Sequence, residues 1–346
     1  MHPRQFSLLT LFWSVLGLSA IGMLNWLVDP FAQYQTGLLP PIIQDSRKEK
    51  LALLEASAES PDGLILGSSR VMKIEPHYLT AKTGLRFFNA GVNHGRPADY
   101  LAWIRWYQQR WQRYPKLVVL GVDTAALHRL VPVDGRVTAE PALANEVPEL
   151  VTWKDRWERA TELWGFKQTR ASLQSIVNRW RRKERVSPAE YFASDGRIVY
   201  REREAEIQQG TYDFAAALRY NEGEFQQLYR DFDDLSLIEV VTLIKIVENL
   251  SQHGTQVYLF NTPFHPDLQH SLEPLPYFVQ RQREAKRLLE LLADRYGASI
   301  ADFSDIESFE GDESDFVDGI HPLESNTRRM MDQLLANPGA KGYALQ

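Results

Sequence analysis

The chain has 346 residues, of which 44% are hydrophobic and 11% aromatic, and this suits a globular protein with a sizeable core. A formal net charge of −6 argues against a general nucleic-acid binder, which is usually basic. The absence of cysteine excludes disulfides, thiolate nucleophiles and cysteine-ligated zinc.

The first predicted element is an apolar helix over Phe6–Val28, which contains no charged residue. At about 1.5 Å per residue it is roughly 35 Å long, enough to cross the hydrocarbon core of a bilayer. A cleaved signal peptide has a shorter apolar core and ends at small residues. Residues 17–20 resemble such a site, but the apolar run continues to Trp26 and Leu27. We expect an uncleaved anchor over residues 1–29; a cleaved signal and a buried core helix are the alternatives.

Charges that flank this helix bear on its orientation. The amino terminus and Arg4 favour a cytoplasmic N-terminus, while Arg47, Lys48 and Lys50 count weakly the other way. Large domains are translocated largely regardless of such charges. We therefore predict a single-pass membrane protein whose main domain is extracytoplasmic.

After a connecting segment over residues 30–60, short apolar runs alternate with longer helical patterns, as in parallel βαβ units. We expect five buried strands at Gly63–Leu66, Leu85–Asn89, Leu117–Leu120, Gln256–Phe260 and Ser299–Phe303. Helices are expected at about residues 98–113, 235–252, 278–296 and 324–335. This pattern predicts an α/β domain over residues 61–346, with a three-layer, doubly wound sheet of about five parallel strands.

Residues 131–234 interrupt the alternation between the third and fourth strands. Their Trp-, Arg- and Glu-rich sequence predicts a largely helical insertion, suited to a lid or a partner surface. Within it, the run Arg179–Arg185 is basic. A solvated helix face is the default interpretation of this run, and contact with anionic lipid head groups is the alternative.

Small or polar residues follow each predicted strand. Because ligands bind beyond the carboxyl ends of strands in a doubly wound sheet, these residues form the candidate site. They are Gly67-Ser68-Ser69-Arg70, Asn89-Ala90-Gly91-Val92-Asn93-His94-Gly95, Gly121-Val122-Asp123-Thr124, Asn261-Thr262-Pro263-Phe264-His265 and Asp318-Gly319-Ile320-His321-Pro322.

In this order, three of the blocks resemble those of the SGNH (GDSL-like) hydrolase superfamily. Gly67-Ser68-Ser69 matches its nucleophile block, Gly91 matches the glycine of its second block, and Asp318-Gly319-Ile320-His321 matches its final Asp-x-x-His block. The resemblance covers residues 60–335 apart from the insertion. It implies an SGNH or flavodoxin-like fold and serine-dependent acyl chemistry.

The resemblance assigns catalytic roles to Ser69, Asp318 and His321. A neutral imidazole suits the task of removing the serine proton, so His321 is the expected base. Asp318, about one helical turn earlier, can hold the second ring nitrogen. The N–H groups of Ser69 and Gly91 are the expected oxyanion hole.

The block after the third predicted strand, Gly121-Val122-Asp123, departs from the family pattern. The family has an asparagine where this chain has Asp123. An ionised carboxylate there would repel the oxyanion, and the loss of one donor costs about 2.7–4 kcal/mol of barrier. Either Asp123 points elsewhere, or Arg70, Asn93 or His94 supplies the missing donor, or the enzyme is slow. His94 and His265 are expected to line the site rather than to act as the base.

Plainer explanations exist for the individual blocks. A Gly-Ser-Ser sequence after a strand is often a βα turn with a capping serine, and Asp-Gly-Ile-His-Pro can be a surface turn. The acidic residues between Asp302 and Asp318 do not match a calcium-binding loop, so we interpret them as a solvated loop. No metal or cofactor motif is present, and the serine mechanism requires none.

An anchored SGNH domain is similar to the D-alanyl transfer proteins of lipoteichoic acid synthesis and to SGNH-type proteins that acetylate exported polysaccharides such as alginate. Those families work beside membrane-bound O-acyltransferases. The resemblance implies an acyltransferase or acylesterase that acts on a cell-envelope glycan or polymer. A plain polysaccharide acetyl esterase and a non-catalytic assembly subunit with a decayed SGNH fold are the alternatives.

Overall fold

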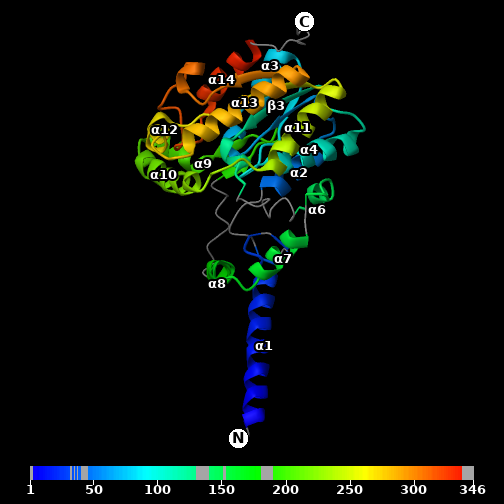
Figure 1. Cartoon of the computed structure of the whole chain (residues 1–346), viewed down its shortest axis with the longest axis vertical. Helices are drawn as coiled ribbons and strands as arrows, with labels where there is room; N and C mark the ends of the chain where they lie inside the picture. Colours follow the sequence, from blue (N-terminus) through cyan, green and yellow to red (C-terminus); the bar gives the residue numbers. More distant parts are fainter. Residues whose placement is uncertain are drawn as a thin grey trace. The chain divides into compact units, whose positions relative to one another are not determined.

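The structure is a computed structural model that describes residues 3–31, 33–34, 36, 38–39, 46–129, 140–150, 153–180 and 190–336. The chain forms two compact units (Figure 1). The first contains Met1–Ser46 and Gly135–Ser187, and the second contains Arg47–Asp134 and Pro188–Gln346. Parts of the predicted connecting segment and of the predicted insertion lie outside the described residues, as does the basic run beyond Trp180.

Among the described residues of the first unit, one long helix is accompanied by three shorter ones: α1 (Pro3–Val28), α6 (Pro141–Ala144), α7 (Trp153–Glu162) and α8 (Phe166–Trp180). Among the described residues, α1 is the helix long and apolar enough to cross a membrane, and it contains the predicted Phe6–Val28 segment. The Asn25 amide donates to Leu163 O at 2.6 Å and to Thr169 Oγ1 at 2.9 Å. These bonds join the carboxyl-terminal part of α1 to the start of α8.

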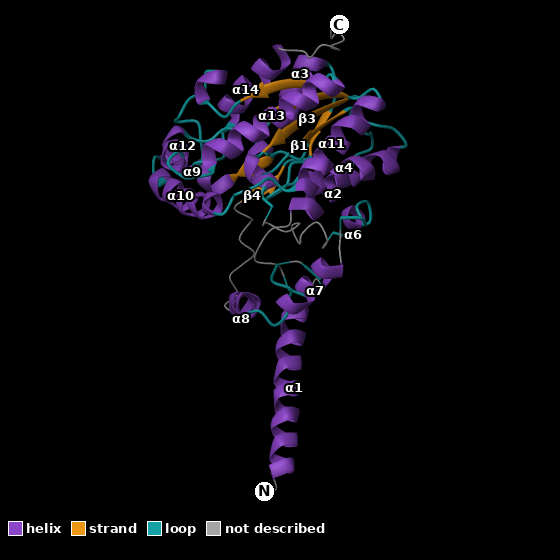
Figure 2. Ribbon diagram, viewed as in Figure 1, coloured by secondary structure: helices purple, strands orange, loops and turns teal. Residues whose placement is uncertain are grey.

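The second unit is built on a five-stranded parallel sheet in the order β2-β1-β3-β6-β7 (Figure 2). The strands are β1 (Gly63–Leu66), β2 (Phe87–Asn89), β3 (Leu117–Val122), β6 (Gln256–Asn261) and β7 (Ser299–Asp302). All five predicted strands are therefore confirmed, although β2 begins two residues late. In this doubly wound order the direction of chain progression reverses between β1 and β3, and ligands of such sheets usually bind beyond the carboxyl ends of the strands at this point.

Helices cover both faces of the sheet (Figure 2). They are α2 (Ser46–Glu55), α3 (Pro76–Thr83), α4 (Pro97–Trp111), α11 (Leu237–Gln252), α13 (Phe278–Tyr296) and α14 (Glu324–Ala336). Alternate residues such as Ile65 and Val119 join a buried cluster with Leu79 of α3 and Met330 of α14. Because both faces are covered, the central strands are apolar at consecutive positions, which is the pattern that made them predictable.

Residues 190–230 belong to the second unit and begin with a hairpin that the sequence does not predict. It pairs β4 (Glu190–Phe192) with β5 (Ile198–Tyr200) in antiparallel register and is followed by α9 (Arg201–Gln209) and α10 (Phe214–Arg230). The hairpin turn docks on β2, where the Asn89 N–H donates to Asp195 O at 2.8 Å. The segment predicted as one insertion is thus divided between the two units.

Candidate active site

Ser69 lies in a tight turn directly after β1. It begins the short helix η1 (Ser69–Val71), which Ser68 caps by accepting the Arg70 N–H at 3.2 Å. Gly67 has a φ of +153°, and a Cβ at this position would lie only 2.7 Å from the Val71 side chain. The turn therefore requires glycine at position 67, and it presents a half-buried Ser69 at the carboxyl edge of the sheet.

The structure brings Ser69 together with both other residues predicted for the triad. His321 Nε2 lies 2.8 Å from Ser69 Oγ, and His321 Nδ1 lies 2.8 Å from Asp318 Oδ2. The imidazole is thus held between a hydroxyl and a carboxylate at hydrogen-bond distance on both nitrogens. The side chain of His321 keeps 16% of its surface exposed, so the serine–histidine pair is in contact with solvent.

Asp318 is arranged to remain an anion. Burial raises the pKa of its carboxyl, but the facing His321 ring and the backbone N–H groups of Ile320 and His321 outweigh burial and leave the pKa below its usual value. Both N–H groups donate to Oδ1, at 2.9 Å and 3.0 Å. A carboxylate with these donors both orients the imidazole and stabilises its protonated form.

The loop that carries Asp318 and His321 is held by residues outside the sequence blocks. The Gly319 N–H donates to Asn221 Oδ1 at 2.9 Å, and the Tyr212 hydroxyl donates to Val317 O at 2.7 Å. Gly319 lies so close to Leu268 that a Cβ would approach it to 2.7 Å. Asn221 lies on α10 and Tyr212 just before it, so this part of the predicted insertion supports the site directly.

Gly91 does not meet the expectation that its N–H faces the substrate. In the structure this N–H donates to Asn89 Oδ1 at 3.0 Å. The Asn89 amide group in turn donates to Val71 O at 2.8 Å and to Ile74 O at 2.9 Å, and Lys50 Nζ donates to its oxygen at 3.2 Å. The Asn-x-Gly sequence therefore stabilises the turn that contains Ser69 through hydrogen bonds of the Asn89 side chain. The role predicted for the Ser69 N–H stays a prediction.

Asp123 lies at the end of β3 in a buried polar network. Thr262, which follows β6, donates its hydroxyl to Asp123 Oδ1 at 2.6 Å and accepts from Arg70 Nη1 at 2.8 Å. Arg70 Nε lies 4.0 Å from the same carboxylate oxygen. The negative charge of Asp123 is thus partly offset by Arg70, which removes part of the repulsion expected of an aspartate in this block.

One nitrogen of the Arg70 guanidinium is buried without a hydrogen-bond partner among the described residues. This nitrogen is Nη2, and the residue is 4% exposed. The guanidinium carbon lies 4.1 Å from the ring centroid of Phe264 and 5.4 Å from that of Phe225. A buried donor without an acceptor is costly, so this position favours a ligand oxygen.

The remaining predicted site residues occupy the margins of the site. His265 is 4% exposed, caps the helix α12 (Pro266–Leu272), and donates its backbone N–H to Gly319 O at 2.9 Å. Asn93 and His94 form the turn after β2, where His94 is exposed and has a φ of +50°. The next residue, Gly95, approaches Gly67 O so closely that a Cβ would lie 2.4 Å away. This turn therefore packs against the serine turn.

The acidic residues between Asp302 and Asp318 are engaged locally. Asp302 accepts from Ser304 Oγ and pairs with Lys286 at 3.0 Å, and Asp312 accepts from the Ser314 hydroxyl at 2.7 Å. In the described part of the chain, no group of three or more histidine or acidic side chains is arranged to hold a metal ion.

A search of protein-family models finds no match for this chain, and a search of the curated proteins finds no significant match either. The functional conclusion therefore depends on the geometry around Ser69 and on the order of the sequence blocks. A hydroxyl, an imidazole and a carboxylate in one hydrogen-bonded row can activate a serine for attack on an acyl carbon.

Proposed function

We propose that this chain is a membrane-anchored serine O-acyltransferase or acylesterase of the SGNH type, acting on an extracytoplasmic glycan or cell-envelope polymer. The observation that carries the proposal is the row Ser69–His321–Asp318, with 2.8 Å on each side of the imidazole. Each of the three residues can occur in an ordinary turn. Ser69 and His321 are 252 residues apart in the sequence, yet with Asp318 they form the hydrogen-bonded row of a catalytic triad.

The reaction proceeds in two half-reactions. Ser69 Oγ attacks the acyl carbon of the donor while its proton passes to His321 Nε2, and Asp318 stabilises the imidazolium through Nδ1–H. The tetrahedral intermediate collapses, the bond to the donor oxygen breaks, and His321 returns the proton to that oxygen. An acceptor hydroxyl or water then attacks the acyl-serine by the same steps, which gives transfer or hydrolysis respectively.

Arg70 is the donor that we assign to the oxyanion in place of the missing asparagine. Its Nη2–H has no acceptor among the described residues. Its charge and that of Asp123 offset each other, so the pair is neutral before the reaction. During attack, the negative charge on the acyl oxygen is balanced by the imidazolium of His321, and a fixed guanidinium donor stabilises it without reorganisation.

The class of substrate follows from the resemblance and from the anchor. The two anchored SGNH families that this chain resembles act on exported polymers and work beside membrane-bound O-acyltransferases. Orientation with the second unit outside the cytoplasm would place Ser69 beside such polymers. A glycan hydroxyl is the acceptor that fits this setting.

The direct test is covalent labelling of the full-length protein in membranes with a fluorophosphonate probe. Wild type should be labelled, and both Ser69→Ala and His321→Ala should abolish labelling because the nucleophile or its base is removed. Ser68→Ala is the matched control, since it removes a neighbouring hydroxyl that only caps η1. Labelling that persists in Ser69→Ala would disprove the assignment of the nucleophile.

Two further outcomes separate the alternatives. Release of acyl groups without any dependence on an acceptor would indicate a polysaccharide acetyl esterase. Absence of labelling in folded, membrane-bound wild type, combined with full biological activity of Ser69→Ala, would indicate an assembly subunit instead of an enzyme.

A further inference from the structure

The helix α8 in the first unit exposes its apolar side chains. Phe166, Leu173, Val177 and Trp180 are 83%, 52%, 44% and 89% exposed. Their spacing of seven, four and three residues places them on one side of the helix. They form an apolar stripe, interrupted between Phe166 and Leu173 by the exposed Arg170, which we call the α8 stripe.

The opposite side of α8 is buried and consists of small or polar residues. Gln168, Ala171, Ser172 and Ser175 are each at most 8% exposed. A helix on the surface of a water-soluble protein shows the reverse pattern, with its apolar side packed inward. We therefore expect the α8 stripe to contact an apolar environment that the chain itself does not provide.

The position of α8 along α1 indicates which environment this is. Side chains of α1 are exposed from Pro3 to Ile21, and the uncharged part of this stretch, from Phe6 to Ile21, is about 24 Å long at 1.5 Å per residue, most of the roughly 30 Å of a bilayer's hydrocarbon core. From Gly22 onward one side of α1 is covered, because Trp164 packs there and donates Nε1–H to Leu18 O at 2.8 Å. The turn between α7 and α8 thus lies at the level where the hydrocarbon core would end.

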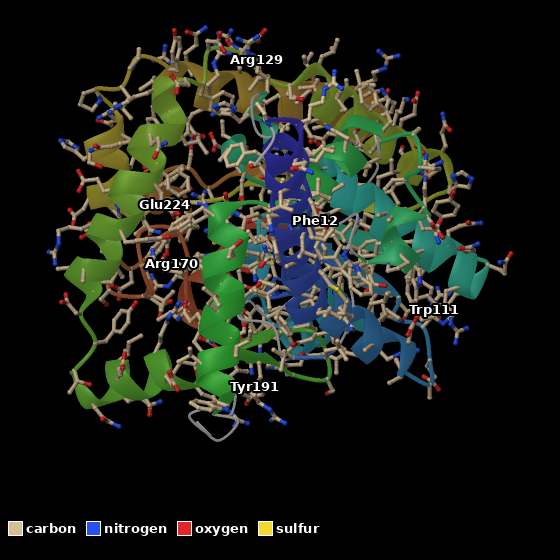
Figure 3. All side chains as sticks on the ribbon, turned by 90° about the horizontal axis from the view of Figure 1, so that it is seen from below. Phe12, Trp111, Arg129, Arg170, Tyr191 and Glu224 are labelled. Atoms are coloured by element: carbon tan, nitrogen blue, oxygen red, sulfur yellow. The ribbon has the colours of Figure 1, made fainter. Side chains whose placement is uncertain are left out.

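The charges of α8 fit the surface of a membrane. Lys167, Arg170 and Arg179 are exposed, and the helix has no acidic residue. Figure 3 shows Arg170 of α8 and Phe12 of α1 from below. On α7, Trp153 and Trp157 are 79% and 65% exposed. Tryptophan is enriched at membrane interfaces, and basic residues there attract anionic head groups.

We propose that α7 and α8 lie in the membrane interface beside α1, with the α8 stripe buried at the boundary of the acyl chains and its basic residues against lipid phosphates. The proposal rests on the membrane anchoring proposed for α1. A helix with an apolar stripe and a basic flank is the form of an interfacial amphipathic helix. The occupant of this surface is therefore lipid.

The natural absence of cysteine allows a direct test with single-cysteine variants of the full-length protein. Leu173→Cys and Trp180→Cys, labelled with a nitroxide and reconstituted into vesicles of phosphatidylcholine and phosphatidylglycerol, are compared by their accessibility to oxygen and to a water-soluble nickel chelate. Oxygen accessibility should exceed nickel accessibility several-fold at both positions. The exposed neighbour Gln174→Cys should show the reverse, because it lies outside the stripe.

Leu11→Cys in α1 separates this proposal from the anchor itself. Lipid accessibility at position 11 together with water accessibility at 173 and 180 would leave the anchor in place and overturn the interfacial helix. Water accessibility at all three positions would overturn both. If 173 and 180 are protected in native membranes but reach water in the purified vesicles, a protein partner covers the stripe and the lipid proposal is wrong.

Discussion

Arg70 directly follows the proposed nucleophile, and its guanidinium is held by Thr262 and by the ring of Phe264. We expect Arg70→Met to lower the rates of probe labelling and acyl turnover by about 10²–10³-fold, because it removes one donor to the oxyanion. The donation strengthens as charge develops, so kcat should fall while KM changes little. Steady-state kinetics on a soluble acetyl ester would measure this split.

Asp123→Asn provides the complementary control at the residue level. The amide oxygen can still accept from the Thr262 hydroxyl, but the negative charge beside the proposed oxyanion site is gone. If Arg70 is the donor, labelling should remain equal to wild type or rise. A loss as large as that of Arg70→Met would show that the network holds structure and that Arg70 does not act on the substrate.

At the level of elements, α10 supports the loop that carries Asp318 and His321. Asn221→Ala removes the acceptor of the buried Gly319 N–H, which typically costs about 1–3 kcal/mol. We expect labelling to slow by about tenfold or more, because the loop no longer fixes His321 against Ser69. Tyr220→Phe, on the exposed side of the same helix, should leave the labelling rate unchanged. Equal effects of the two variants would argue against a positioning role for Asn221.

Sequence patterns predicted the elements that carry their own local information. The central strands could be found because burial on both faces makes residues such as Leu117–Leu120 continuously apolar. The β4–β5 hairpin was missed because its three-residue strands lie in a charge-rich segment, outside the regular alternation of strands and helices that made the equally short β2 predictable. The same limit applied to the candidate site, where the blocks predicted Ser69 and His321 but not Asn221, which is an ordinary polar residue in the middle of a helix. The hydrogen bond from Gly91 to Asn89 also depends on side-chain orientation, which no spacing rule specifies.

At the level of the whole molecule, we expect burial of the Lys50 ammonium to lower the stability of the fold. It is fully buried, and burial lowers the pKa of its ammonium well below 10.5, although Asp195 raises it. Between that lowered pKa and the unfolded value of about 10.4, the unfolded chain binds more protons at this site, so its contribution to stability rises with pH. At acidic pH the buried Lys50 is a charged ammonium, and its burial lowers the free energy of unfolding. This loss becomes smaller as the pH rises from the lowered pKa toward 10.4.

Lys50→Met should therefore raise the melting temperature by a few degrees at neutral pH, with the gain shrinking toward pH 10. Thermal unfolding of both proteins across this pH range measures the effect. Lys48→Met, exposed on the same helix, should change little at any pH. A lower melting temperature for Lys50→Met at neutral pH would mean that the bond to Asn89 outweighs the burial of the amine.

The distance along the chain between Ser69 and His321 has a consequence for when this protein becomes chemically competent. The two residues are separated by 252 positions, with most of the sheet between them. A growing chain that ends before residue 321 contains Ser69 without its proposed base. On the proposed mechanism, the hydroxyl would therefore stay inert until nearly the whole second unit has been made and folded.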